Sequence, residues 1–165
     1  MKKINLFVSQ KYVDLNAISA FQALSIYLEK SNCKALTRYV NWEIVIDTQL
    51  DDEVVVNRLT QGSFLLFNPN KEDYVSSLNM TKDNVVYVSI EDNLDINNSS
   101  FLNQLRKLSG LSIHSVQKKI VWACTINEAT QESRRQYIQQ HLLGVNGVAS
   151  GLLLNPIYES FSFLN

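Results

Sequence analysis

The fold is decided, on the sequence alone, by the stretch INLFVSQKYVDLNA at residues 4–17. Residues 4–8 are an apolar run of the length and type of a β-strand, and apolar residues at helical spacing follow from 17 to 30. In an open α/β sheet, the turn between such a strand and helix lies at the carboxyl edge, where ligands usually bind. This turn contains no glycine. The sequence therefore lacks the glycine-rich phosphate cradles of Walker and dinucleotide-binding proteins.

Apolar runs of strand length recur along the chain. They lie at residues 35–40, with an extension or restart at 43–46, and at 64–67, 85–90, 119–124 and 148–154. Several are apolar at consecutive positions, which is typical of strands covered on both faces. Helical patterns at 17–30, 51–61, 101–108 and 131–143 separate these runs. We therefore predict a Rossmann-like α/β fold, a three-layer sandwich with a mostly parallel sheet of five or six strands.

Length and composition predict a single α/β domain spanning residues 1–165. The chain is 45% hydrophobic and 19% charged, and it contains no internal repeat or linker. Its net charge is -1, so no overall basic field draws it to nucleic acid. No apolar stretch approaches the roughly 20 residues of a membrane span, and the start is too polar for a signal peptide. We expect a cytoplasmic protein without nucleic acid partners or membrane insertion.

The cysteines and histidines predict no metal or redox chemistry. Cys33 and Cys124 lie far apart in the sequence, and the cytosol disfavours disulfides, so each is expected to be a free, inert thiol. Neither His114 nor His141 has a histidine or cysteine at ligand spacing. A zinc site built from soft ligands is therefore not expected.

Oxygen-bearing side chains follow three of the predicted strands, with Asn68 and Asn70 after the run at 64–67. Asp14 follows the first strand, and Glu91 and Asp92 follow the strand at 85–90. In the predicted sheet these groups meet at one crevice, where they would suit a hard cation such as magnesium or manganese. The alternative interpretation is local, because aspartate and asparagine are common helix caps. On that interpretation Asp14 or Asn16 caps the helix that begins at residue 17.

The same turn resembles the N-terminal motif of the DHH phosphoesterases, which cleave phosphoanhydride or phosphodiester bonds with manganese. In that family the turn contains a histidine, two aspartates and then Ala-Ile at the start of a helix. This sequence keeps Asp14 and the pair Ala17-Ile18. Gln10 stands at the histidine position, and Asn16 stands at the second aspartate.

Two further ligand positions of this family are changed in the chain. The aspartate that ends a later strand corresponds to Asn68, and the Asp-His-His triplet corresponds to Glu91-Asp92-Asn93. All these departures remove charge or imidazole, whereas a dinuclear metal site needs several anionic or imidazole ligands. The resemblance covers at most about the first 95 residues, and it implies the family's fold without its catalysis.

The C-terminal tail, residues 156–165, is more apolar than a chain end usually is. It carries Tyr158, Phe161 and Phe163, and ordered aromatic side chains left in water would form a large exposed patch. We expect this tail to pack back on its own domain or to dock on another chain. The three aromatic residues are therefore candidates for partner binding.

These observations support two functional hypotheses. The first is a non-catalytic protein-interaction domain or assembly subunit, which binds a protein partner or forms a homo-oligomer and needs no cofactor. It is favoured by the loss of most of the family's metal ligands and by the aromatic C-terminal tail. The alternative is a metal-dependent phosphoesterase or nucleotide-binding protein that holds manganese or magnesium with Asp14, Glu91 and Asp92. A cation that binds only the folded chain would raise its melting temperature, which separates the two hypotheses.

Overall fold

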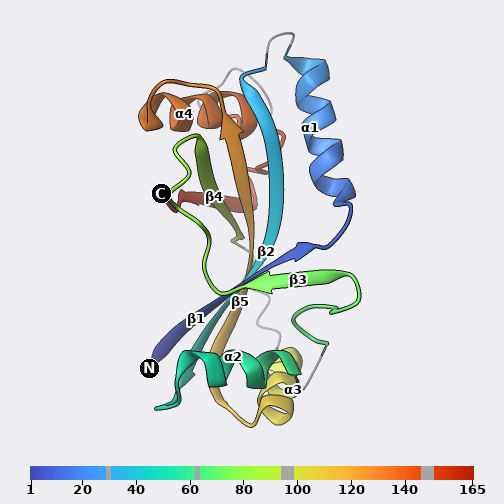
Figure 1. The fold of residues 1–165 in the computed structure, drawn as a ribbon, viewed down its shortest axis with the longest axis vertical. Helices are drawn as coiled ribbons and strands as arrows, with labels where there is room; N and C mark the ends of the chain where they lie inside the picture. The colour runs from blue at the N-terminus through green and yellow to red at the C-terminus, as the bar shows by residue number, and fades with distance from the viewer. Residues whose placement is uncertain (29–30, 62–63, 94–98, 146–150) are drawn as a thin grey trace. The chain divides into compact units, whose positions relative to one another are not determined.

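A computed structural model describes residues 1–28, 31–61, 64–93, 99–145 and 151–165 (Figure 1). The helices among these residues are α1 (Leu15–Tyr27), α2 (Asp52–Gln61), α3 (Ser99–Ser109), α4 (Gln131–Tyr137) and the π-helical segment η1 (Ile138–Leu142). The strands are β1 (Lys2–Gln10), β2 (Cys33–Asp47), β3 (Glu72–Val75), β4 (Val85–Asp92), β5 (Ser112–Ile126) and β6 (Glu159–Phe163). The four predicted helices are confirmed, the last of them as α4 followed by η1. None of the described helices has both the length and the apolar character needed to cross a bilayer.

The strands form one antiparallel sheet in the order β3-β1-β2-β5-β4-β6. Strand β1 pairs antiparallel with both of its neighbours, so that Leu6 lies opposite Trp42 of β2 and Val8 lies opposite Tyr74 of β3. The prediction of a mostly parallel, Rossmann-like sandwich is therefore wrong. It was inferred from continuous apolar runs, and β4 shows why this fails, because its residues 85–90 are all buried in an antiparallel sheet. Burial on both faces does not require parallel neighbours.

The described residues of Met1–Tyr12, Val40–Leu78 and Asp95–Lys119 form one compact unit, which we call the first unit. Its core follows the two-residue period of the strands. Ile4 and Leu6 of β1 are buried on the same face as Ile44 and Ile46 of β2, with Ile4 opposite Ile44. The helices bury their own apolar residues in the same cluster: Val55 and Leu59 from α2, and Leu105 from α3.

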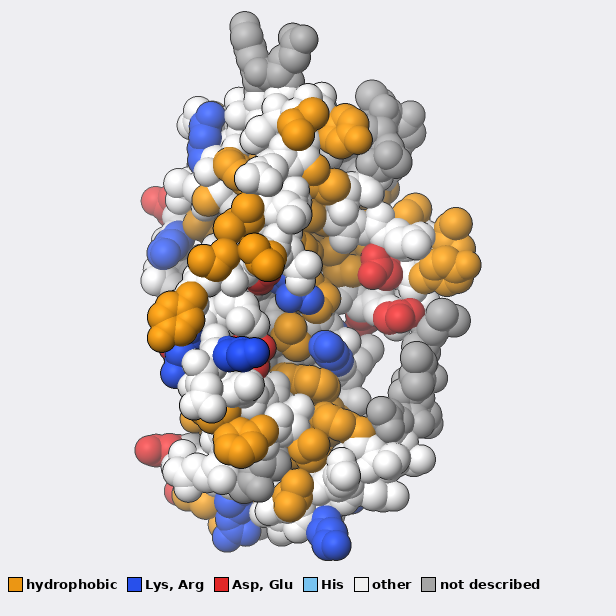
Figure 2. Space-filling view, turned by 90° about the vertical axis from the view of Figure 1, so that its right-hand side faces the viewer, with side chains coloured by type: hydrophobic (Ala, Val, Ile, Leu, Met, Phe, Trp, Pro, Cys, Tyr) orange, Lys and Arg blue, Asp and Glu red, His pale blue; other side chains and the backbone are white. Residues whose placement is uncertain are grey.

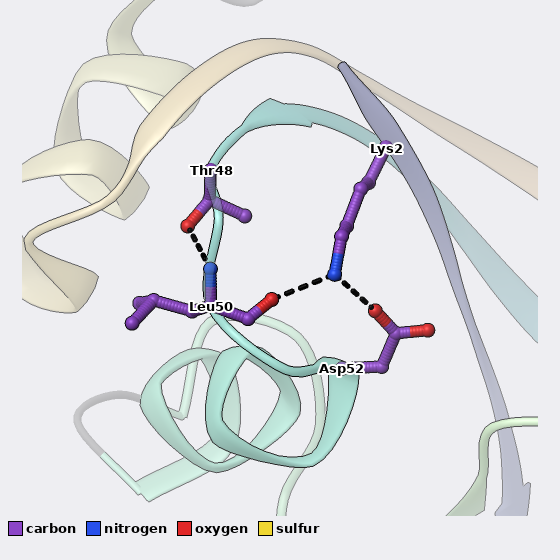
Figure 3. Close-up of polar contacts among 4 residues, drawn as sticks. All are labelled: Lys2, Thr48, Leu50 and Asp52. Atoms are coloured by element: carbon purple, nitrogen blue, oxygen red, sulfur yellow. Dashed lines mark hydrogen bonds and ion pairs between the residues drawn. The ribbon is translucent and has the colours of Figure 1, made fainter.

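A polar contact holds the start of α2 in the first unit. The Lys2 ammonium group, on β1, donates to the carbonyl oxygen of Leu50 at 2.7 Å and lies 3.0 Å from Oδ1 of Asp52 (Figure 3). The Leu50 amide donates to Oγ1 of Thr48 at 3.1 Å. Asp52 lies in the first turn of α2, where its negative charge also interacts favourably with the helix dipole.

The described residues of Val13–Tyr39, Asn79–Leu94 and Ile120–Asn165 form the second unit. The long strands β2 and β5, of 15 residues each, contribute one part to each unit. In the second unit α1 runs alongside β2 (Figure 1). Its core contains Ala17 and Leu24 from α1, Cys124 from β5, and Ile138 and Leu142 from η1. The spacing of Ala17 and Leu24, two helical turns apart, places both on the inner side of α1.

Two predicted strands differ from the structure. Residues 64–67 form no strand; Leu66 is buried, and its carbonyl oxygen accepts a 2.7 Å hydrogen bond from the Trp42 indole. In the run at 148–154, residues 148–150 lie outside the described part, and 151–154 are irregular with Leu153 and Leu154 buried. The short strands β3 and β6 were not predicted. Each is an edge strand of four or five residues, which leaves little periodicity to detect.

Candidate interaction site on helix α1

Asp14 is the N-cap of α1. Its Oδ1 accepts hydrogen bonds from the backbone amides of Asn16 at 2.9 Å and Ala17 at 3.2 Å. Its Oδ2 lies 4.0 Å from the Arg38 guanidinium group. A capping carboxylate satisfies amides that have no partner within the helix. The expectation that this residue caps the helix is therefore confirmed, and both of its oxygens have neighbours within the protein.

The described residues contain no group of three or more His, Cys, Asp or Glu side chains that could hold a metal ion. Glu91 and Asp92, at the end of β4, face Ser160 and Glu159 of β6 across the strand pair. The Ser160 hydroxyl donates to a Glu91 carboxylate oxygen at 3.5 Å. The three predicted metal ligands are thus placed in two local environments, with Asp14 in a helix cap and the other two in a strand pair.

The aromatic residues of the tail belong to β6 or directly precede it. Phe161 and Phe163 are half-buried against the core of the second unit, and their rings meet edge to face with centroids 5.7 Å apart. The Arg135 guanidinium lies 5.4 Å from the centre of the Phe163 ring. Tyr158 is half exposed. Of the three predicted partner-binding residues, Tyr158 therefore offers the largest exposed fraction.

Helix α1 presents apolar side chains to solvent as well as to the core. Leu15 is 72% exposed, Ile26 78% and Tyr27 81%. Ile18 and, just before the helix, Val13 are also exposed, at 43% and 57%. Hydrophobic side chains accordingly gather over α1 in the upper part of Figure 2. We call these five side chains the α1 face.

No charged residue interrupts this surface within the helix. The 13 residues of α1, LNAISAFQALSIY, contain no Asp, Glu, Lys or Arg. A surface helix normally carries charged residues on its outer side. The helix α2 does so, with Asp52, Glu53 and Arg58. The α1 helix therefore has the composition of a helix that is covered on both sides, although within the described part of the protein only one side is buried.

A shallow pocket adjoins the N-terminal half of α1, in the same unit. Its volume is about 460 Å³, and it is lined by Asn16, Ser19, Ala20, Arg38, Trp122, Leu152 and Leu153. The only charged group in this lining is the guanidinium of Arg38, which lies beside the Asp14 carboxylate. The surface around α1 thus combines exposed apolar side chains with a hollow of little net charge.

A second pocket of about 440 Å³, between η1 and the start of β2, is polar. Its lining includes Asn32, Glu128, Tyr137 and His141. Several of its polar groups bond to one another, since the Asn32 side-chain amide donates to Glu128 at 2.6 Å and the Asn32 backbone amide donates to the Tyr137 hydroxyl at 3.1 Å. These groups already have partners in the protein, so the pocket does not point to a ligand.

The sequence analysis did not identify the α1 face. The apolar residues from 17 to 30 were assigned to a helix, and their inward positions explain the assignment. The signal that would have found the face is the absence of any charged residue between Asp14 and Glu29 in the sequence. The chain matches no family model and no curated protein. The resemblance to DHH phosphoesterases therefore stays a prediction.

Proposed function

We propose that this protein is a non-catalytic interaction domain or assembly subunit that binds another protein chain through the α1 face. The observation that carries the proposal is the exposure of Leu15, Ile26 and Tyr27, each more than two thirds exposed on a helix without charge. Contiguous exposed apolar surface is unusual on a monomeric protein and typically marks an interaction site.

The size of the α1 face is consistent with this role. At ~100 Å² for a fully exposed aliphatic side chain and ~200 Å² for tyrosine, the five exposed fractions sum to on the order of 400 Å². Ile18 and Tyr27 are nine positions apart and so lie on opposite sides of the helix, which means that one partner covers only part of this area. Covering all of it would contribute at most about 10 kcal/mol at ~25 cal/mol per Å². This is comparable to the ~4–15 kcal/mol that two proteins lose in translational and rotational freedom on association. The face therefore supports binding when polar contacts around it add to the total.

Two properties complete the proposal. Both cysteines are free thiols, which is consistent with a reducing cytoplasmic location. The domain acts without a cofactor, because binding through apolar contacts requires none.

Photo-crosslinking of the full chain tests the proposed function. A photoreactive phenylalanine analogue at the exposed position Gln22, in the middle of the outer side of α1, should yield a defined crosslinked product in cells. The double variant Leu15→Asp, Ile26→Asp should lose at least nine tenths of this product, since two buried charges oppose association. Val54→Asp is the matched control: Val54 is a 40% exposed residue in the first turn of α2, where a new aspartate is tolerated. An equal yield from the double variant and the control would refute the proposal.

A further inference from the structure

We propose that the partner of the α1 face inserts an acidic side chain into the pocket beside α1, where its carboxylate binds the Arg38 guanidinium group. The inference rests on the proposed function, because it names the chemistry by which the same partner is recognised. It is carried by hydrogen-bond donors of this pocket that have no acceptor within the described part of the protein.

The Arg38 guanidinium group lines the pocket with its hydrogen-bonding capacity unused. Its side chain, on β2, is only 23% exposed, and a guanidinium group carries five N–H donors. The contact to Oδ2 of Asp14 is 4.0 Å long, which makes it an ion pair but is too long for a hydrogen bond. No other residue in the described part of the chain accepts a hydrogen bond from this group. Because polar groups withdrawn from water normally have partners, an acceptor supplied from outside the chain is expected here.

The rest of the lining combines further donors with apolar side chains. Trp122, on β5, is buried, and its indole N–H donates to none of the residues that the structure describes. The Asn16 amide and the Ser19 hydroxyl, from the first turns of α1, are exposed side-chain donors. The remaining three lining residues are alanine or leucine. Such a lining suits a carboxylate carried on a short aliphatic stem, as in aspartate or glutamate.

The local charge also favours an anion. The negative charge of Asp14 offsets the positive charge of Arg38, and the N-terminus of α1 adds about half a positive charge. Within the described ranges, no aspartate or glutamate lines the pocket itself. The sum of these contributions is therefore positive. A guanidinium group binds a carboxylate through two parallel, charge-assisted hydrogen bonds, which a neutral carbonyl group cannot match.

The pocket lies on one flank of α1, and this orients the partner. Asn16 and Ala20 line the pocket, and Tyr27 follows seven positions after Ala20, which places all three on the same flank of the helix. Ile18 lies on the opposite flank. A partner whose carboxylate binds Arg38 would therefore also contact Tyr27. The apolar contact and the charged contact thus belong to one continuous surface.

Nuclear magnetic resonance of the isotope-labelled full chain tests the pocket with two matched probes. N-acetyl-glutamate N-methylamide carries the proposed carboxylate, and N-acetyl-glutamine N-methylamide replaces it by a neutral amide of the same size. The glutamate probe should shift the Arg38 Nε–H and Trp122 Nε1–H signals and bind about five-fold more tightly than the glutamine probe, or better. Arg38→Gln should abolish the difference between the probes. Equal binding of the two probes to the wild-type chain, or binding of neither, would overturn the proposal.

Asp14→Asn is the matched control for the ion pair. Arg38→Gln and Asp14→Asn both remove the 4.0 Å contact, but only Arg38→Gln removes the donors, and asparagine keeps the helix cap. Because Asp14→Asn removes a negative charge beside the pocket, it should bind the glutamate probe about two-fold more tightly than the wild type, or better. Circular dichroism verifies that both variants fold. An equal loss of binding in the two variants would show that the ion pair only supports the local structure, and the proposal would be rejected.

Photo-crosslinking connects the pocket to the partner. With the photoreactive analogue at Gln22, Arg38→Gln should yield less than about one fifth of the wild-type product, whereas Asp14→Asn should yield at least as much as the wild type. A wild-type chain that binds the glutamate probe, together with a full yield of product from Arg38→Gln, would indicate a site for free small carboxylates. That result would overturn the assignment of the pocket to the partner.

These outcomes are distinguishable from a failure of the proposed function. If the double variant Leu15→Asp, Ile26→Asp loses the crosslinked product but Arg38→Gln keeps it, the interaction function stands and the carboxylate proposal is rejected. If the product does not depend on Leu15 and Ile26, the proposed function fails, and the assignment of the pocket to its partner fails with it.

Discussion

Removal of the Asp14 side chain should cost measurable stability, and the structure gives the size of the effect. Its Oδ1 accepts from two backbone amides, and replacing such a cap by alanine costs about 0.5–2 kcal/mol. The 4.0 Å approach to Arg38 adds up to about 1 kcal/mol, since both side chains retain partial solvent contact. We therefore expect Asp14→Ala to lower the free energy of unfolding by about 0.5–3 kcal/mol. For a chain of this size, each kcal/mol corresponds to roughly 2–4 °C in melting temperature.

Asp14→Asn separates the cap from the charge. Asparagine caps a helix about as well as aspartate does, so this variant should lose only the contribution of the ion pair, no more than about 1 kcal/mol. Urea unfolding followed by circular dichroism gives both values. Hydrogen exchange at the Asn16 and Ala17 amides should accelerate in the alanine variant and stay slow in the asparagine variant. Equal losses in the two variants would refute the capping argument and assign the effect to the carboxylate charge.

The same variants test a cation at this turn. Both oxygens of Asp14 have protein neighbours, so millimolar manganese or magnesium should leave the melting temperature of the wild-type chain unchanged. A rise that Asp14→Asn abolishes would contradict this expectation and support the metal-dependent alternative.

Three further expectations follow from buried polar groups. Burial raises the pKa of Cys33 to about 11 and that of Cys124 well above its ordinary value, so an aromatic disulfide reagent at pH 8 should label neither thiol until denaturant is added; labelling of the native chain would contradict this. The pKa of Glu43 is lowered from its ordinary value of 4.5: partial burial alone would raise it, but the hydrogen bonds and charges of Lys3 and Lys119, at 2.8 and 3.3 Å, outweigh that effect. The wild-type chain should therefore be more stable than Glu43→Gln, with the full difference in free energy of unfolding above about pH 4.5 and none once the pH falls below the lowered pKa. A difference that persists in acid would show that the charge of Glu43 is not its source. Asn41 is buried, its Nδ2 donates to Asn5 at 3.2 Å, and its Oδ1 has no partner among the described residues. In urea unfolding, Asn5→Leu should therefore lower the free energy of unfolding by about 1–3 kcal/mol, whereas Asn41→Leu should leave it unchanged or raise it. The reverse order of the two variants would refute this expectation.

The helices could be predicted because their signals are local. The cap at Asp14 and the spacing of Ala17 and Leu24 lie within a few residues of one another, and the structure uses them as the sequence indicates. The direction of the strands has no such signal. Residues 85–90 are buried throughout, and it is the pairing of β4 with its neighbours, such as the antiparallel register with β6, that shows the direction of the strand. That partner lies about seventy residues away in the sequence, a separation that periodicity cannot bridge.

Strand β2 shows a second limit of the same kind. The sequence left open whether the run at 35–40 extends to 43–46 or a new strand starts there. In the structure β2 continues through both runs, and the Asn41 side chain between them is buried and bonded to Asn5 of β1. The contact joins residues on different strands, so it becomes visible only once the register is known.

The α1 face was missed for a different reason, since all of its information is local. A count of apolar residues assigns them to a core, and Ala17 and Leu24 do occupy one. The core does not use Leu15 or Ile26, which are mostly exposed, and lysine or glutamate at such positions usually changes folding stability by no more than about 0.5 kcal/mol. Folding alone therefore does not account for apolar residues there. A requirement that this side of the helix be covered by another chain does account for them.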